Sequence, residues 1–533
     1  MCEADSGLDG QRKSGSPTPG PAALSRVAGV LRWLLAGASV WYIGCYLAVA
    51  LLRIGYPFEL EWMEGAVANH VLRVLNGQPL YASPSIDFVP FIYAPFYFYV
   101  SAGFATVLGF SLFPLRLVSF LSSLACFAII YAFVRRETGS RFFGLLSAAL
   151  FAATFRAAGA WLDVARPDSL FLALSLAALY QTRFSESGLG LAAAGALFAF
   201  AFHTKQTALF IALPVMAWSL ATRRSRSLPL IAAFAVLAAG TMALLNFVYH
   251  GWYKYYVLDL PSHQPLLQTG LLRFWTRDLS MTFPVAFGLA VVLLVRRCPD
   301  SERRVRFFYL LGGAGMVAAA WFGRLHRGGY DNALLPAYAG LAVLGAVCAW
   351  NLTQTHAAPG PGRKALAIAV YFAYIVQFGL LWYDPAAQIP SRQDKQAGRD
   401  LVATLAGFPG EIFMPQHGYL SELAGKRSFA HQMAICDVLN AGPSEIGNRL
   451  MSDIAQTIEQ HRFSAIVLDH PFLLQDAVLT HYRLQYRAFS SEDVFWPMTG
   501  MRTRPEGVLV PRADASAASP LPSAQSTESS GCD

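Results

Sequence analysis

The run VAGVLRWLLAGASVWYIGCYLAVALL, residues 27–52, carries a single charged residue, Arg32. About 20 consecutive apolar residues in a helix match the hydrocarbon thickness of a bilayer. The run is too long for the core of a signal peptide, and no small-residue cleavage pattern follows it. We therefore expect a membrane-spanning helix here, and the rest of the chain repeats its character.

Further apolar runs follow as far as residue 383, and charged residues gather between them. Only 14% of the 533 residues are charged, whereas soluble proteins carry about a quarter. The composition therefore predicts an all-α polytopic membrane protein. The further runs lie near 91–110, 115–134, 142–158, 169–182, 189–202, 207–221, 228–249, 279–295, 307–323, 333–350 and 365–383.

The basic residues indicate which side of the membrane each loop occupies. The net charge of +8 comes from Lys and Arg in short loops, which is the cytoplasmic signature of membrane proteins and no sign of nucleic-acid binding. Arg12, Lys13, Arg26 and Arg32 place the N-terminus in the cytoplasm. If run 91–110 spanned, every strongly basic loop would then lie outside. If it does not span, all of these loops become cytoplasmic.

The residues of run 91–110 support the second choice. Pro90, Pro95 and a series of Phe and Tyr occupy its first half, and Tyr prefers the membrane interface. We therefore predict about eleven transmembrane helices, with 91–110 as an external juxtamembrane helix. The loops 53–90, 159–168, 203–206, 250–278 and 324–332 then all face outward.

The composition also predicts four segments. Residues 1–26 are polar and rich in Gly, Pro and Ser, so we expect a disordered cytoplasmic N-terminus. Residues 27–383 form the transmembrane domain, with a first external loop at 53–114. Residues 392–505 mix polar positions with short strand-like runs, which predicts a small external soluble α/β domain. Residues 511–533 resemble a disordered tail.

The first outward-facing cluster of charge follows the first apolar run. Glu61 and Glu64 are three residues apart in Glu59-Leu60-Glu61-Trp62-Met63-Glu64-Gly65, so on a helix they would share a face. Carboxylates beside a membrane are suited to proton abstraction or cation binding. A solvated helix start, where acids favour the helix dipole, explains them equally well.

Two further clusters lie where apolar runs meet the external side. Arg166 and Asp168 belong to Asp163-Val164-Ala165-Arg166-Pro167-Asp168, and Asp168 is placed to cap the following helix. Lys205 lies in His203-Thr204-Lys205-Gln206. A Lys at this depth either snorkels to the surface or meets an anion, for which we suggest a lipid phosphate.

The last cluster is the loop from Arg324 to Asn332, which precedes another apolar run. Arg and His side chains beside two Gly at a helix start suit a phosphate, and a loop that binds lipid headgroups would look the same. The chain has no Walker A motif, no His-Glu-x-x-His and no dinucleotide fingerprint. The candidate ligands in this loop are His326, Arg327, Tyr330 and Asn332.

Taken in order and on one predicted face, these clusters resemble the GT-C superfamily of membrane glycosyltransferases. The nearest members are protein O-mannosyltransferases, lipid A aminoarabinose transferases and Rgt-type core transferases. The resemblance covers roughly residues 27–350. It rests on the acidic loop, on the segments Leu75–Tyr81 and Pro90–Pro95, on Asp168, on Lys205, and on Tyr330 to Pro336.

The chain departs from the family pattern at two points. The family's first acidic pair is usually Asp-Glu, whereas Glu61 and Glu64 stand here, so either could be the base. The family's Lys-Gly-Pro element retains its Lys as Lys205, but Gln206 and Thr207 follow it.

The resemblance implies an inverting glycosyltransferase of the inner (plasma) membrane. It would move a hexose or pentose from a polyprenyl-phosphate donor to a hydroxyl of a glycan, lipid or protein on the external, periplasmic side. Glu61 or Glu64 would act as base, and Lys205, His326, Arg327, Tyr330, Asn332 and Arg166 would bind the phosphate. A divalent cation, Mg²⁺ or Mn²⁺, would lie near Asp168. The alternatives are a polytopic transporter or lipid flippase, and a non-catalytic component of envelope assembly.

Overall fold

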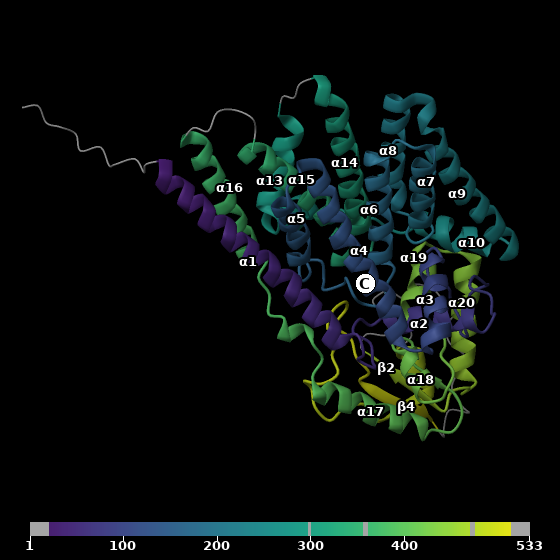
Figure 1. Ribbon diagram of the computed structural model, residues 1–533. Helices are drawn as coiled ribbons and strands as arrows, with labels where there is room; N and C mark the ends of the chain where they lie inside the picture. The colour runs from purple at the N-terminus through teal and green to yellow at the C-terminus, as the bar shows by residue number, and fades with distance from the viewer. Residues whose placement is uncertain (1–20, 297–299, 355–360, 470–474, 513–533) are drawn as a thin grey trace, which may run out of the picture.

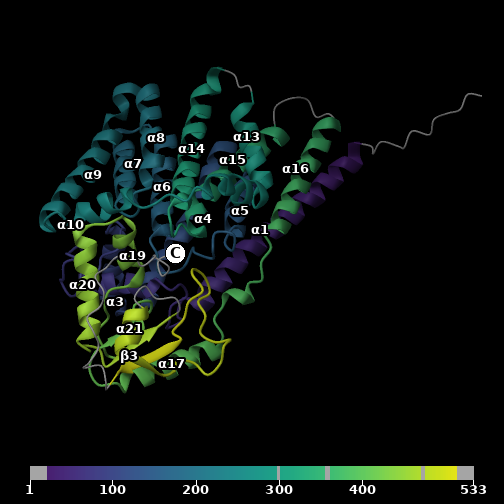
Figure 2. The same ribbon diagram turned by 180° about the vertical axis from the view of Figure 1, so that it is seen from behind.

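The computed structural model describes residues 21–296, 300–354, 361–469 and 475–512. Long helices stand side by side in one layer, and shorter helices with a small sheet form a second layer against one end of them (Figure 1; from behind, Figure 2). The chain is therefore a polytopic helical membrane protein with a small α/β domain, as the sequence predicts.

The helices of the first layer coincide with the apolar runs other than 91–110. They are α1 (Pro21–Arg53), α4 (Leu112–Thr138), α5 (Arg141–Ala153), α6 (Asp168–Phe184), α7 (Gly188–Phe202), α8 (Ala208–Arg223), α9 (Leu228–Val248), α13 (Pro284–Val295), α14 (Arg303–Leu325), α15 (Leu335–Gln354) and α16 (Pro361–Leu380).

Among the described residues, six helices are long and apolar enough to cross a membrane, or seven if one bent pair of helices counts as a single span. This number treats α8 and α9 as a single span of 41 residues. They are in fact separate helices joined by a turn at Arg224–Ser227. Helices α5 and α7, of 13 and 15 residues, are shorter than the 20 or so residues that a full crossing needs. The number of eleven crossings stays a prediction.

The basic loops gather at one end of this layer. Arg183 at the end of α6 pairs with Glu137 at the end of α4 at 2.9 Å. Arg223 at the end of α8 donates to the carbonyl of Thr182 at 2.7 Å. The outward-facing loops of the prediction meet at the opposite end, beside the soluble domain (Figure 1). The relative sidedness derived from the positive charges is thus consistent with the packing of the helices.

Run 91–110 does not join the first layer. It forms α3 (Phe96–Leu108), which packs on α2 (Glu64–Leu75) and on the start of α4. Tyr97 and Phe98 belong to the same apolar core as Ile435 and Leu450 of the soluble domain. The segment between α1 and α4 and the C-terminal domain therefore form one packed body.

The C-terminal domain contains a four-stranded mixed sheet in the order β1-β2-β4-β3. The strands are β1 (Ile412–Phe413), β2 (Ala465–Leu468), β3 (Tyr482–Arg487) and β4 (Gly507–Pro511), and the helices are α17 (Arg392–Ala406), α18 (Gly418–Leu423), α19 (Gln432–Asn440), α20 (Glu445–Glu459) and α21 (Gln475–His481). Two of the short strand-like runs predicted within 392–505, the apolar stretches 412–414 and 465–468, correspond to β1 and β2.

Two predicted boundaries differ from the structure. Helix α1 begins at Pro21, so residues 21–26 are helical, while residues 1–20 lie outside the described part. Strand β4 extends the soluble domain beyond residue 505, because Val508, Leu509 and Val510 pair with β2 and β3. Apart from residues 511 and 512, the tail predicted at 511–533 also lies outside the described residues.

Candidate active site

Glu64 is held in a complete set of hydrogen bonds. Its carboxylate accepts two bonds from the Arg116 guanidinium, at 2.9 and 2.6 Å. The backbone amides of Leu60 and Ala165 each donate to it at 2.6 Å. Burial raises the pKa of Glu64, but the Arg116 charge and these bonds outweigh it and hold the pKa below its usual value. This carboxylate joins the first loop to α4 and has no free lone pair directed at a substrate.

Glu61 has different surroundings although it is fully buried. Oε2 lies 3.4 Å from an Arg166 nitrogen, and within the described part of the chain Oε1 has no hydrogen-bond partner. Burial raises the pKa of Glu61 to about 8, against the opposing charge of Arg166. The shared helical face predicted for Glu61 and Glu64 was wrong, because α2 begins only at Glu64.

Glu61 lines a cavity of about 360 Å³ where the two layers meet. Arg166 also lines it, donates to the Tyr93 hydroxyl at 2.7 Å, and lies over the rings of Tyr93 and Trp161. The Tyr93 hydroxyl and the charge of Glu61 raise the pKa of Arg166 against the effect of burial. The guanidinium is thus charged and positioned beside Glu61.

The loop after α14 contributes another part of the cavity wall. Arg327, Tyr330 and Asn332 all line it. Gly328 adopts a φ of 78°, which turns the chain between Arg327 and Tyr330 in a conformation that glycine adopts readily. Arg327 donates to Asn440 of α19 at 3.3 Å, so this loop also contacts the soluble domain.

His326 does not join this group. It ends α14 half-buried, with its ring 4.5 Å from the ring of Phe322, and it is absent from the described lining of the cavity. The sequence placed it with Arg327 because the two are adjacent. The extended backbone at His326 turns neighbouring side chains in different directions.

Asp168 links three segments that are far apart in the sequence through hydrogen bonds. Its carboxylate accepts from Lys205 Nζ at 2.6 Å, from Asn332 at 3.0 Å and from Trp161 at 3.0 Å. It is the first residue of α6 and forms no side-chain cap there, so the predicted capping role was wrong. Asn332 joins the Asp168–Lys205 pair to the cavity that holds Glu61.

The donor set around Asp168 does not fit a divalent cation. Hard cations take several oxygen ligands, whereas both oxygens of Asp168 accept bonds from nitrogen donors, one of them the Lys205 ammonium. No cluster of three His, Cys, Asp or Glu side chains with metal-site geometry occurs among the described residues. We therefore derive no catalytic step through a metal.

The cation predicted near Asp168 remains open to a direct measurement. Because Lys205 already supplies positive charge at this carboxylate, we expect the transfer reaction that the resemblance implies to persist after dialysis of the purified protein against EDTA. A loss of turnover that Mg²⁺ or Mn²⁺ restores would show instead that a metal takes part.

The C-terminal domain forms part of the wall of the Glu61 cavity, and the sequence did not predict this contribution. Gln432, Met433 and Asn440 of α19 line the cavity, as do Gly500 and Met501. The backbone of Thr499 pairs with that of Glu61. A Cβ at Gly500 would lie 2.9 Å from Glu61 Cγ, closer than packed carbon atoms approach, so a glycine is needed there. No motif in the sequence marks these positions.

A histidine ties the same domain to the acidic loop. His417 bonds to Glu59 through one ring nitrogen and to Asp469 at 2.9 Å through the other. Burial lowers the pKa of His417, but the charges of Asp469 and Glu59 raise it to about 10. The charged His417 therefore holds the segment that carries Glu61 against the soluble domain.

An apolar groove of about 690 Å³ is lined by Gln206 and Thr207, which follow Lys205 in the chain, and Thr207 also lines a small cavity together with Lys205. Gln206 and Thr207 stand at its polar end, and side chains of α8 and α14 form its walls, among them Phe210, Leu213 and Leu311. These helices belong to the membrane layer (Figure 1), so the groove faces the region that lipid tails occupy.

Comparisons with known proteins agree with this architecture. Residues 92–253 match the family model of dolichyl-phosphate-mannose-protein mannosyltransferase. The fold is similar to ArnT from Cupriavidus metallidurans bound to undecaprenyl phosphate, with a TM-score of 0.56, 14% identity, and 91% of this chain and 99% of that chain covered. The apo state of ArnT gives a TM-score of 0.54 at the same identity and coverage. No curated protein matches the sequence. The resemblance to the GT-C membrane glycosyltransferases is confirmed for the fold and the matched segment.

Proposed function

We propose that this chain, a polytopic membrane protein with the GT-C fold, transfers a sugar from a polyprenyl-phosphate donor to an acceptor hydroxyl with inversion. The observation that carries the proposal is one cavity lined by Arg166, Arg327 and the buried carboxylate of Glu61, whose Oε1 has no hydrogen-bond partner among the described residues. Base and cations so placed suit attack by a hydroxyl and departure of a phosphate.

The donor's two halves match two neighbouring features. The apolar groove along α8 and α14 suits a polyprenyl tail, and ArnT, whose fold is similar, was solved with undecaprenyl phosphate. Lys205 contacts Asp168 and shares a small cavity with Thr207, which stands at the polar end of the groove. A phosphate at this end would lie within reach of the Lys205 ammonium, while the sugar extends toward Glu61.

The chemistry follows from these positions. Glu61 takes the proton of the acceptor hydroxyl, whose oxygen attacks the anomeric carbon as the bond to the donor phosphate breaks. The transition state resembles an oxocarbenium ion. Negative charge grows on the leaving phosphate, and Lys205, Arg327 and Arg166 are placed to stabilise it.

The direct test is transfer by the purified protein from a panel of labelled polyprenyl-phosphate hexoses and pentoses. Release of the polyprenyl phosphate, matched by a labelled product of inverted configuration, supports the proposal. A protein that binds these lipids, leaves them intact and carries them across vesicle membranes would be a flippase instead.

The raised pKa of Glu61 predicts a pH profile. Only the ionised carboxylate accepts a proton, and burial raises the pKa of Glu61 to about 8. We therefore expect kcat/KM to rise about tenfold per pH unit below that value and to level off above it. The charge of Arg166 lowers this pKa, so Arg166→Met should move the rise to higher pH. A profile that is flat from pH 6 to 9 would remove Glu61 as the base.

The proposed location is the inner (plasma) membrane, with a cytoplasmic N-terminus and an external C-terminal domain. Ser140 between α4 and α5 and Ser225 between α8 and α9 lie in the basic turns. Reporter fusions or single cysteines at both positions should report cytoplasm. An external signal at both would reverse the topology and place the candidate site on the cytoplasmic side.

A further inference from the structure

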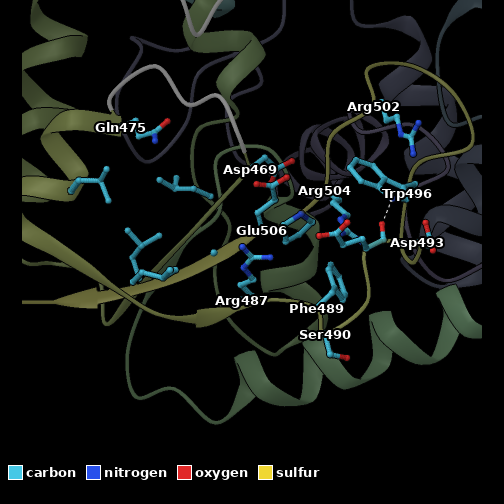
Figure 3. A pocket seen from close by; sticks show the side chains of 17 residues that line it. Asp469, Gln475, Arg487, Phe489, Ser490, Asp493, Trp496, Arg502, Arg504 and Glu506 are labelled. Carbon is cyan, nitrogen blue, oxygen red and sulfur yellow. Dashed lines mark hydrogen bonds between the residues drawn. The ribbon is translucent and has the colours of Figure 1, made fainter.

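A second cavity, of about 850 Å³, lies within the C-terminal domain (Figure 3). One wall is apolar and consists of Leu468, Leu479, Leu484 and Leu509. Leu479 and Leu484 are exposed although they sit on regular elements. A cavity of this size exceeds what a single sugar needs and falls within the usual range for ligand sites.

The opposite wall is polar and partly fixed in place. Arg504 is buried and lies over the rings of Trp496 and Phe489, at 4.5 and 5.4 Å. Arg502 lies over Trp496 at 4.6 Å, and Figure 3 shows both guanidiniums beside that ring. One Arg504 nitrogen donates to the carbonyl of Ser491 at 3.1 Å, while Nε has no partner among the described residues. The wall thus holds two guanidiniums against one aromatic ring.

The charges of this wall nearly cancel. Arg487, Arg502 and Arg504 face Glu492, Asp493 and Glu506, and the carboxylate of Asp469 is already bonded to His417. A phosphate or a sulfate would meet the guanidiniums together with three carboxylates that repel it. A hydroxyl group, in contrast, donates to carboxylates and accepts from guanidiniums, so this lining suits an uncharged ligand with many hydroxyls.

We propose that this cavity binds a neutral oligosaccharide. A pyranose ring has a face of C–H groups, which suits the leucine wall, and a rim of hydroxyls, which suits the alternating Arg and acidic side chains. Such a glycan would be the non-reacting part of the acceptor. This inference therefore extends the proposed function and rests on it.

The two cavities adjoin along one segment of chain. Gly500 and Met501 line the cavity of Glu61, and the next residue, Arg502, lines the second cavity together with Arg504 and Glu506. Neighbouring Cα atoms are about 3.8 Å apart, so the walls of the two cavities are joined directly through the Met501–Arg502 peptide. Binding energy from the remote sugars would then position the reacting hydroxyl.

The test uses the full chain in detergent on an array of neutral manno-, gluco- and galacto-oligosaccharides with their phosphorylated and sulfated counterparts. We expect retention of at least one neutral oligosaccharide, with a tenfold or larger loss of affinity in Arg502→Gln and in Glu506→Gln. Glu459→Gln, an exposed carboxylate on α20 away from the cavity, serves as the matched control and should bind normally.

Three results would overturn the proposal: no retention of any neutral oligosaccharide, preference for the charged counterparts, or binding that both cavity variants leave unchanged. A second assay measures hydrolysis of the lipid donor by water in the absence of acceptor. It tests the proposed chemistry at Glu61 independently of glycan binding. If Glu61-dependent hydrolysis persists while glycan binding fails, only the glycan site is refuted. If wild-type protein binds the glycan but leaves every donor intact, the transfer reaction is refuted instead.

Discussion

Glu61→Gln should lower the rate of sugar transfer by about 10²–10⁴-fold, the contribution typical of a positioned general base. The substitution keeps the shape of the side chain and removes only its ability to accept the proton. With a pKa raised to about 8, Glu61 is largely protonated at neutral pH, so a neutral amide resembles the resting state of the group. The variant should therefore insert, fold and bind donor like the wild type.

Glu64→Gln is the comparison that separates the two acidic residues. It leaves the buried Arg116 facing a neutral amide in place of a carboxylate that makes two bonds to it. Loss of one partner of a buried pair costs about 3–5 kcal/mol, so the melting temperature should fall. If Glu61→Gln retains near-wild-type turnover in protein with an unchanged melting temperature, Glu61 is not the base.

The membrane architecture could be predicted because two strong signals act together. Apolar runs report burial in lipid, and clusters such as Arg223, Arg224 and Arg226 report the side of each loop. The parity of these loops predicts that residues 91–110 do not span, and in the structure α3 packs on α2 and α4 beside the layer of long helices. Each signal is local in sequence, so no long-range contact was needed to read it.

The pairing of Lys205 with Asp168 was also within reach of the sequence. A Lys in an apolar stretch requires a partner, and the predicted topology placed the two residues on one face. The different roles of Glu61 and Glu64 could not be predicted from the sequence, because they depend on Arg116, which lies inside an apolar helix. Gly500 and Met501 were missed for a similar reason, since they reach Glu61 only through the packing of the C-terminal domain.

The pair formed by Lys205 and Asp168 permits a double-mutant cycle with two readouts. Lys205 Nζ lies 2.6 Å from Asp168 Oδ1, and both side chains are largely buried. Lys205→Met should weaken folding, because it leaves the Asp168 carboxylate without its cation, and should slow transfer about 10²–10³-fold, because the leaving phosphate loses a donor. Folding and transfer thus respond to different properties of the same ammonium group.

The double variant Lys205→Met/Asp168→Asn separates those properties. Removal of both charges should restore much of the lost melting temperature, because no buried charge remains unpaired. Transfer should stay as low as in Lys205→Met alone, with a raised KM for the donor, because no neutral side chain replaces the ammonium at the phosphate. If transfer recovers together with stability, Lys205 serves only to neutralise Asp168, and the donor phosphate must be bound by Arg327 and Arg166 without it.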